Sequence, residues 1–106
     1  MADLIRQEIG QLLEREVHDP RIGFATVTAV DLSGDLRTAR VFVSVLGEEP
    51  QKQQALEGLR AASSFLRSQL AHRLNLRYTP SIEFQLDRTQ EYTERIDELI
   101  RRTKGR

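Results

Sequence analysis

Residues 24–46 read FATVTAVDLSGDLRTARVFVSVL, and this stretch decides the fold. Two segments rich in Val, Thr and Phe, residues 24–31 and 39–46, flank the sequence LSGD at 32–35, in which glycine is available for a positive φ. Every second residue of the later segment is Ala or Val, as in a strand with one apolar face. The stretch therefore predicts an antiparallel β-hairpin whose apolar face must pack against other elements of the chain.

The segments on either side of the hairpin predict helices. Residues 3–17 carry apolar side chains at helical spacing, and His18-Asp19-Pro20 ends the pattern because the residue before a proline avoids helical geometry. Residues 51–74 form the longest periodic segment. Its apolar stripe comprises Ala55, Leu56, Leu59, Ala62, Leu66, Leu70 and Leu74.

Phe65 does not fit this stripe. At ~100° per residue it lies about 120° from the centre of the stripe. Ser63 and Ser64 precede it, and serine weakens helix interiors. Either Phe65 is exposed, or the helix bends at Ala62, Ser63 and Ser64 and resets its buried face. We favour the bend, which predicts broken or distorted helical hydrogen bonding between Ala62 and Phe65, with Phe65 at least partly buried.

The remainder of the chain adds a third strand and a tail. Alternating apolar residues at 82–86 predict a strand after Thr79-Pro80, and residues 90–102 predict a short C-terminal helix. The order helix, strand, strand, kinked helix, strand indicates an α+β fold, with a three-stranded sheet and its helices packed on one face. At 106 residues the chain fits a single domain over residues 1–106, with an ordered core at about 3–88.

The charge pattern leaves two interpretations open. The formal net charge is zero, which counts against a domain that is basic overall, the simplest nucleic-acid footprint. However, no acid occurs between Glu57 and Glu83, and all but two of the basic residues are arginine, which suits phosphate contacts. This stretch is either a nucleic-acid contact or a solvated helix face. Its basic residues are Arg60, Arg67, His72, Arg73 and Arg77.

No motif for catalysis, metal binding or a cofactor is present in the sequence. The absence of cysteine excludes disulfides and thiolate metal sites, and His18 and His72 lack a metal-binding spacing. Paired acids such as Asp31 and Asp35 flank a turn and are typical of solvated surface. The sequence thus predicts a binding protein that is no enzyme and needs no metal or cofactor. We expect no membrane segment and no small-molecule substrate, and a cytoplasmic location.

Three segments in this order resemble the ribosome-binding factor A (RbfA) family. They are LLEREVHDPRIGFATVTAVDLSGDLRTARVFVSVLG at 12–47, ALEGLRAASSFLRSQLAHRLNLRYTPSIEFQLD at 55–87 and RIDELI at 95–100, so the resemblance covers about 6–99. It implies a type II KH-like domain, in which an Ala-x-Gly kink replaces the GxxG loop of ordinary KH domains. The matching positions are Ala62, Ser63 and Ser64, where the glycine of the family is missing.

The resemblance also implies a function in ribosome biogenesis. It implies binding to the small (30S) ribosomal subunit and its 16S rRNA, action as a monomer, and aid to late maturation and 5′-end processing without RNA cleavage, chiefly in the cold. The candidate RNA-binding residues are Arg60, Ser64, Arg67, Arg73 and Arg77. Two alternatives stay open: a generic single-stranded-RNA-binding KH-like module, and a protein-interaction or dimerisation domain whose arginines are only solvated surface.

Overall fold

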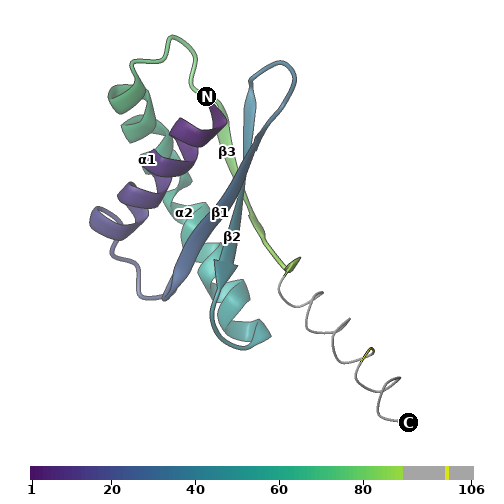
Figure 1. Ribbon diagram of the computed structural model, residues 1–106. Helices are drawn as coiled ribbons and strands as arrows, with labels where there is room; N and C mark the ends of the chain where they lie inside the picture. Colours follow the sequence, from purple (N-terminus) through teal and green to yellow (C-terminus); the bar gives the residue numbers. More distant parts are fainter. Residues whose placement is uncertain (90–99, 101–106) are drawn as a thin grey trace.

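The computed structural model describes residues 1–89 and residue 100, and it shows an α+β fold (Figure 1). The predicted order of elements is confirmed over this part of the chain. The tail helix predicted for residues 90–102 falls almost entirely outside the described residues. The elements are α1 (Ala2–Arg15), β1 (Ala25–Leu32), β2 (Thr38–Val45), α2 (Glu49–Leu74) and β3 (Ser81–Leu86).

The sheet has β2 at its centre, antiparallel to β1 and parallel to β3. The parallel pairing needs a long crossover, which α2 provides. Both helices lie on the same side of the sheet, as predicted (Figure 1). The inward-facing residues of β2 are almost free of solvent: Ala39, Val41 and Val43 are fully buried, and Val45 is 8% exposed. They pack against α1 and α2 through Ile5, Ile9, Leu12, Leu59, Leu66 and Leu70, all fully buried.

The turn between β1 and β2 uses a different residue from the one that the sequence suggested. Gly34 does not take the positive φ; Leu36 does, with φ 61°. The Leu36 amide donates to the Ser33 carbonyl at 2.9 Å. The Asp35 carboxylate accepts from the Ser33 hydroxyl at 2.7 Å and from the Arg37 amide at 3.1 Å. These side-chain bonds stabilise the turn, so that Leu36 is held in the left-handed region and remains 57% exposed.

The helix is not broken at Ala62, Ser63 and Ser64, and the bend predicted there stays a prediction. Helix α2 is continuous from Glu49 to Leu74, and Phe65 is 42% exposed. The Ser63 hydroxyl donates to the Arg60 carbonyl at 2.7 Å, one turn earlier. A serine that bonds backward in this way is accommodated inside a helix without breaking it. The predicted apolar stripe is confirmed, and Phe65 lies outside it.

The ends of α2 are set by local chemistry. Gly47 has φ 125°, and a Cβ there would lie 3.0 Å from Gln51 Cδ and closer still to Gln51 Oε1, so the position requires glycine. That Gln51 oxygen accepts from the Glu48 amide at 2.6 Å, which satisfies a free donor at the helix start. At the other end Asn75 adopts the left-handed conformation (φ 49°, ψ 45°) that commonly terminates helices. The chain then returns toward the start of β3.

Helix α2 passes very close to the connection between α1 and β1. A Cβ on Gly58 would lie 2.9 Å from Ile22 Cγ1 and 3.3 Å from an Asp19 carboxylate oxygen. The small residue therefore sets the spacing between α2 and this connection. The connection itself is braced by Arg21, whose guanidinium pairs with Asp19 at 2.7 Å.

The Arg88→Gln substitution is expected to raise the pKa of Glu49 from about 2 toward its ordinary value of 4.5. Arg88, after β3, donates two hydrogen bonds to the Glu49 carboxylate at the start of α2, one of them 3.0 Å long, and these lower the pKa. Gln53 donates a weaker bond of 3.3 Å.

Because the pKa of Glu49 is depressed in the folded state, the stabilisation is complete above about pH 4.5 and is lost as the pH falls toward about 2. NMR titration of the Glu49 carboxyl group measures the pKa directly. The control, Gln53→Ala, is expected to give a smaller rise. A pKa still near 2 in Arg88→Gln would contradict the assignment of the shift to Arg88.

Candidate RNA interface

Three of the predicted RNA-binding residues gather around one hollow on α2. Ser64 and Arg67 lie one turn apart on an exposed face of the helix, and Arg77 reaches the same place from the loop after it. The hollow has a volume of about 480 Å³. Its lining residues are Ser64, Arg67, Ser68, Ala71, Arg77, Tyr78 and Thr79. We call it the helix-side hollow.

Arg67 fixes the loop over the helix. Its guanidinium donates to the Thr79 carbonyl from Nε at 3.2 Å and from Nη2 at 3.0 Å. A backbone carbonyl carries no net charge, so the positive charge of Arg67 is positioned without being neutralised. The side chain is thereby held ready for an anion at the rim of the helix-side hollow.

Arg60 shares this face, but Arg73 does not. Arg60 is exposed about two turns before Arg67 and does not line the hollow. Arg73 points toward α1 instead, and its Nη1 pairs with Glu8 Oε2 at 3.2 Å. At ~100° per residue Arg73 lies well away from Arg60 and Arg67 around the helix. The structure therefore brings Arg60, Ser64, Arg67 and Arg77 to one side of the molecule and leaves Arg73 out.

The charge on this face is not balanced by neighbouring acids. Within residues 1–89 no carboxylate is within ion-pair distance of Arg60, Arg67 or Arg77. Other arginines of the same part of the chain do have such partners: Arg21 pairs with Asp19 and Arg88 pairs with Glu49. A neutral protein can thus carry a locally positive surface, which is what an RNA backbone requires.

A second hollow adjoins the first, and the sequence interpretation missed it. This hairpin-side hollow has a volume of about 580 Å³ and is lined by Asp35, Leu36, Arg37, Arg67, Tyr78, Thr79 and Ser81. It lies between the tip of the hairpin and the loop before β3. The sequence signal was an aromatic residue between Arg77 and Thr79-Pro80, in a loop where no core position was predicted.

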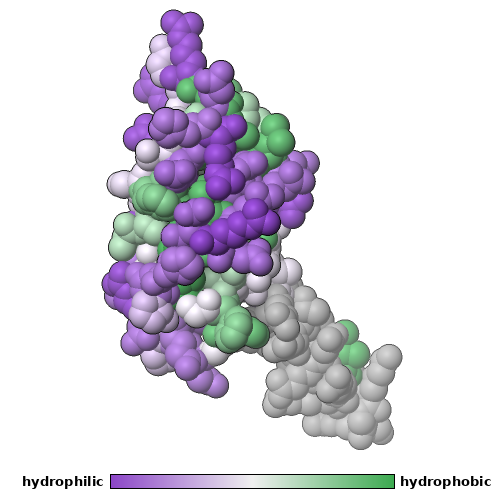
Figure 2. Space-filling view, turned by 90° about the vertical axis from the view of Figure 1, so that its left-hand side faces the viewer, coloured by the Kyte–Doolittle hydropathy of each residue, from purple (hydrophilic) through white to green (hydrophobic). Residues whose placement is uncertain are grey.

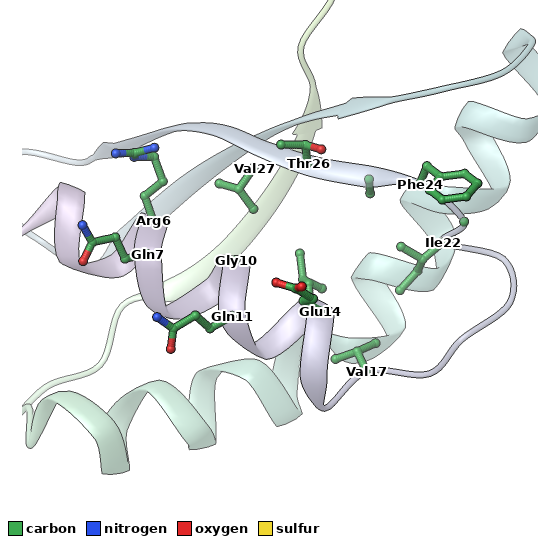
Figure 3. A pocket seen from close by; sticks show the side chains of 13 residues that line it. Arg6, Gln7, Gly10, Gln11, Glu14, Val17, Ile22, Phe24, Thr26 and Val27 are labelled. Atoms are coloured by element: carbon green, nitrogen blue, oxygen red, sulfur yellow. The ribbon is translucent and has the colours of Figure 1, made fainter.

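A third hollow lies elsewhere, between α1 and β1 (Figure 3). It has a volume of about 820 Å³ and a largely apolar floor that includes Val17, Ile22 and Val27. Arg6 and Glu14 at its rim carry opposite charges, so it offers no concentration of positive charge. The helix side of the molecule is mostly hydrophilic, with apolar residues in small separate patches (Figure 2).

The described residues contain no feature of a metal centre or a membrane span. No group of three or more His, Asp or Glu side chains is placed among them to hold a metal ion. Neither of the two helices in this part of the chain has the length and apolar character that a bilayer crossing demands.

The fold places the chain among α+β domains of KH-like type, with a mixed three-stranded sheet. The family model "Ribosome-binding factor A" matches residues 1–100, and the chain belongs to the ribosome-binding factor A family.

Solved structures of the same family are similar to the chain. The crystal structure of ribosome-binding factor A from Thermus thermophilus has 30% sequence identity and a TM-score of 0.73, over 80% of this chain and 89% of that one. A putative ribosome-binding factor A of Thermotoga maritima has 35% identity and a TM-score of 0.67, over 79% and 84% of the two chains. A Thermus thermophilus RbfA homology model fitted into the cryo-EM map of a 30S–RbfA complex has 31% identity and a TM-score of 0.69, over 82% and 91%.

Proposed function

We propose that this protein is a ribosome assembly factor that binds the small ribosomal subunit through its rRNA. The observation that carries the proposal is the set of exposed arginines on and beside α2, Arg60, Arg67 and Arg77, which have no acidic partner in the described residues. Family membership and the 30S complex of a Thermus relative support the choice of partner. Ser64, beside Arg67, adds a hydroxyl that can donate to a phosphate oxygen.

The mechanism that fits this surface is selective binding. A protein that binds one rRNA conformation more tightly than another shifts the population toward the first, by as much as the two affinities differ. It needs no catalytic group for this. We propose that the chain acts as a monomer in the cytoplasm during late subunit maturation, that it favours correct processing of the 5′ end without cleaving RNA, and that its effect is largest in the cold.

Co-sedimentation with purified small subunits is the experiment that tests this function. The full chain is expected to pellet with small subunits and not with large subunits, and its affinity is expected to fall as salt rises because phosphate contacts release counterions. A panel of unstructured RNA oligonucleotides serves as the control. Equal affinity for the oligonucleotides and the subunits would favour the generic single-stranded-RNA module. Self-association with no binding to either would favour the protein-interaction domain.

A further inference from the structure

Tyr78 presents an aromatic ring to solvent on an anchored piece of backbone. The residue is 80% exposed. The next residue, Thr79, has its carbonyl held by Arg67, and Pro80 behind it is buried. A large ring that gains so little from burial in the folded protein, on a backbone held so firmly, is a preorganised surface for a flat partner.

The ring stands between the two hollows, and its surroundings on the two sides differ. Tyr78, Arg67 and Thr79 line both the helix-side and the hairpin-side hollow. Arg77 lines only the helix-side hollow, and its guanidinium carbon lies 5.7 Å from the centroid of the Tyr78 ring, a cation–π distance. The Arg77 cation is thus on the helix side of the ring, and the hairpin-side hollow is open on the other side.

The hairpin-side hollow has the chemistry of a base site rather than a phosphate site. Leu36 adds an exposed apolar wall, held in place by its turn. The Asp35 carboxylate uses Oδ1 for the Ser33 hydroxyl and the Arg37 amide. Its Oδ2 lies 3.9 Å from Arg37 Nε, which is an ion-pair distance but too long for a hydrogen bond, so Oδ2 can still accept from an amino group. A carboxylate repels phosphate, but it accepts hydrogen bonds from the exocyclic amino group of adenine, cytosine or guanine. Arg67 at the rim, which has no acidic partner in residues 1–89, supplies positive charge for a flanking phosphate.

We propose that the hairpin-side hollow binds one unpaired base of the rRNA, stacked on Tyr78 with its amino group toward Asp35. The volume of about 580 Å³ lies within the range of small-ligand sites, roughly 300–1,000 Å³. The inference rests on the proposed function, since the base belongs to the RNA that the arginines hold. It adds a contact that reads an unstacked nucleotide, whereas the arginines contact only the backbone.

The test compares three variants for binding to purified small subunits over a range of salt concentrations. Tyr78→Ala is expected to weaken binding roughly 5- to 150-fold, the range measured for loss of one base–aromatic stack, with an unchanged salt dependence because no charge is removed. Tyr78→Phe keeps the ring and is expected to bind like the unmodified protein. Phe24→Ala is the matched control, since Phe24 is also 80% exposed but lies at the opposite end of the sheet. Thermal unfolding of each variant verifies the fold.

The outcomes separate this inference from the proposed function. If the unmodified protein binds small subunits and Tyr78→Ala binds equally well, the base site is refuted and the proposed function stands. If Tyr78→Phe is as weak as Tyr78→Ala, stacking is refuted, because the hydroxyl rather than the ring makes the contact. If Phe24→Ala weakens binding and Tyr78→Ala does not, the contact lies at the α1–β1 hollow. If the unmodified protein itself fails to bind small subunits, the proposed function is refuted, and the base site is refuted with it.

Discussion

Replacing Leu66 by alanine is expected to lower the free energy of unfolding by about 2–5 kcal/mol, the cost of removing a buried leucine and leaving a cavity. Leu66 is fully buried in the middle of α2 and packs in the core between the helices and the sheet. Domains of this size have only about 5–15 kcal/mol of stability in total, so the variant is expected to unfold at a much lower denaturant concentration. Chemical denaturation followed by circular dichroism gives the difference.

The neighbouring Phe65→Ala is the matched control for this experiment. Phe65 is 42% exposed and lies outside the buried stripe, so its truncation is expected to cost about 1 kcal/mol or less. The pair therefore tests the continuity of α2 as well as its packing. If the helix were interrupted at Ser63 and Ser64 and its buried face reset, Phe65→Ala would be the more damaging of the two substitutions. That ranking would contradict the continuous helix.

Neutralising Arg60, Arg67 and Arg77 together with glutamine is expected to weaken small-subunit binding about 100-fold at ~0.1 M salt. The affinity falls with salt, and each lost contact with a phosphate of single-stranded RNA makes the slope of log affinity against log salt less steep by about 0.7. Three lost contacts therefore reduce the steepness by about 2. All three side chains are exposed and without acidic partners in residues 1–89, so the core is expected to tolerate the change. The change also removes the Arg67 bonds to the Thr79 carbonyl, so thermal unfolding of the variant verifies the fold. Salt-dependent filter binding or co-sedimentation measures both quantities.

A second triple variant with the same change in net charge provides the control. Arg6, Arg15 and Arg73 lie on α1 or face it, and Arg73 is already paired with Glu8. Their replacement by glutamine is expected to leave the salt slope nearly unchanged. If both triple variants lost affinity equally, the attraction would come from net charge alone, and the face that carries Arg67 would have no special role. If neither lost affinity, the arginines would be solvated surface.

The order of the elements was predictable because each one carries its own signal. The hairpin strands alternate, the helices repeat at helical spacing, and Thr79-Pro80 separates α2 from β3. Phe65 could not decide between a bend and a straight helix, because a residue off the apolar stripe indicates exposure as readily as a bend. The Ser63 hydroxyl found an acceptor within the helix itself, so the serines gave no reason for a break.

The candidate site was predictable only in part. Ser64 and Arg67 share a helix face, which spacing alone reveals, whereas the partner of Arg73 on α1 is a tertiary contact that spacing does not contain. The role of Tyr78 could not be predicted, because it depends on contact between the tip of the hairpin and the loop before β3. This contact follows from the parallel pairing of β2 with β3, which no local sequence pattern specifies.

The same parallel pairing has a consequence for the order in which the molecule folds. Strands β1 and β2 are joined by a short turn and can pair early, but Thr38 pairs with Ser81, which lies beyond the whole of α2 in the sequence. Pairing strands that lie so far apart in the sequence is slow compared with forming local contacts. The Ser81 amide donates to the Arg37 carbonyl at 2.8 Å, at the edge of the hairpin-side hollow. Docking of β3 is therefore expected to be a late step, and this hollow exists only after that step is complete.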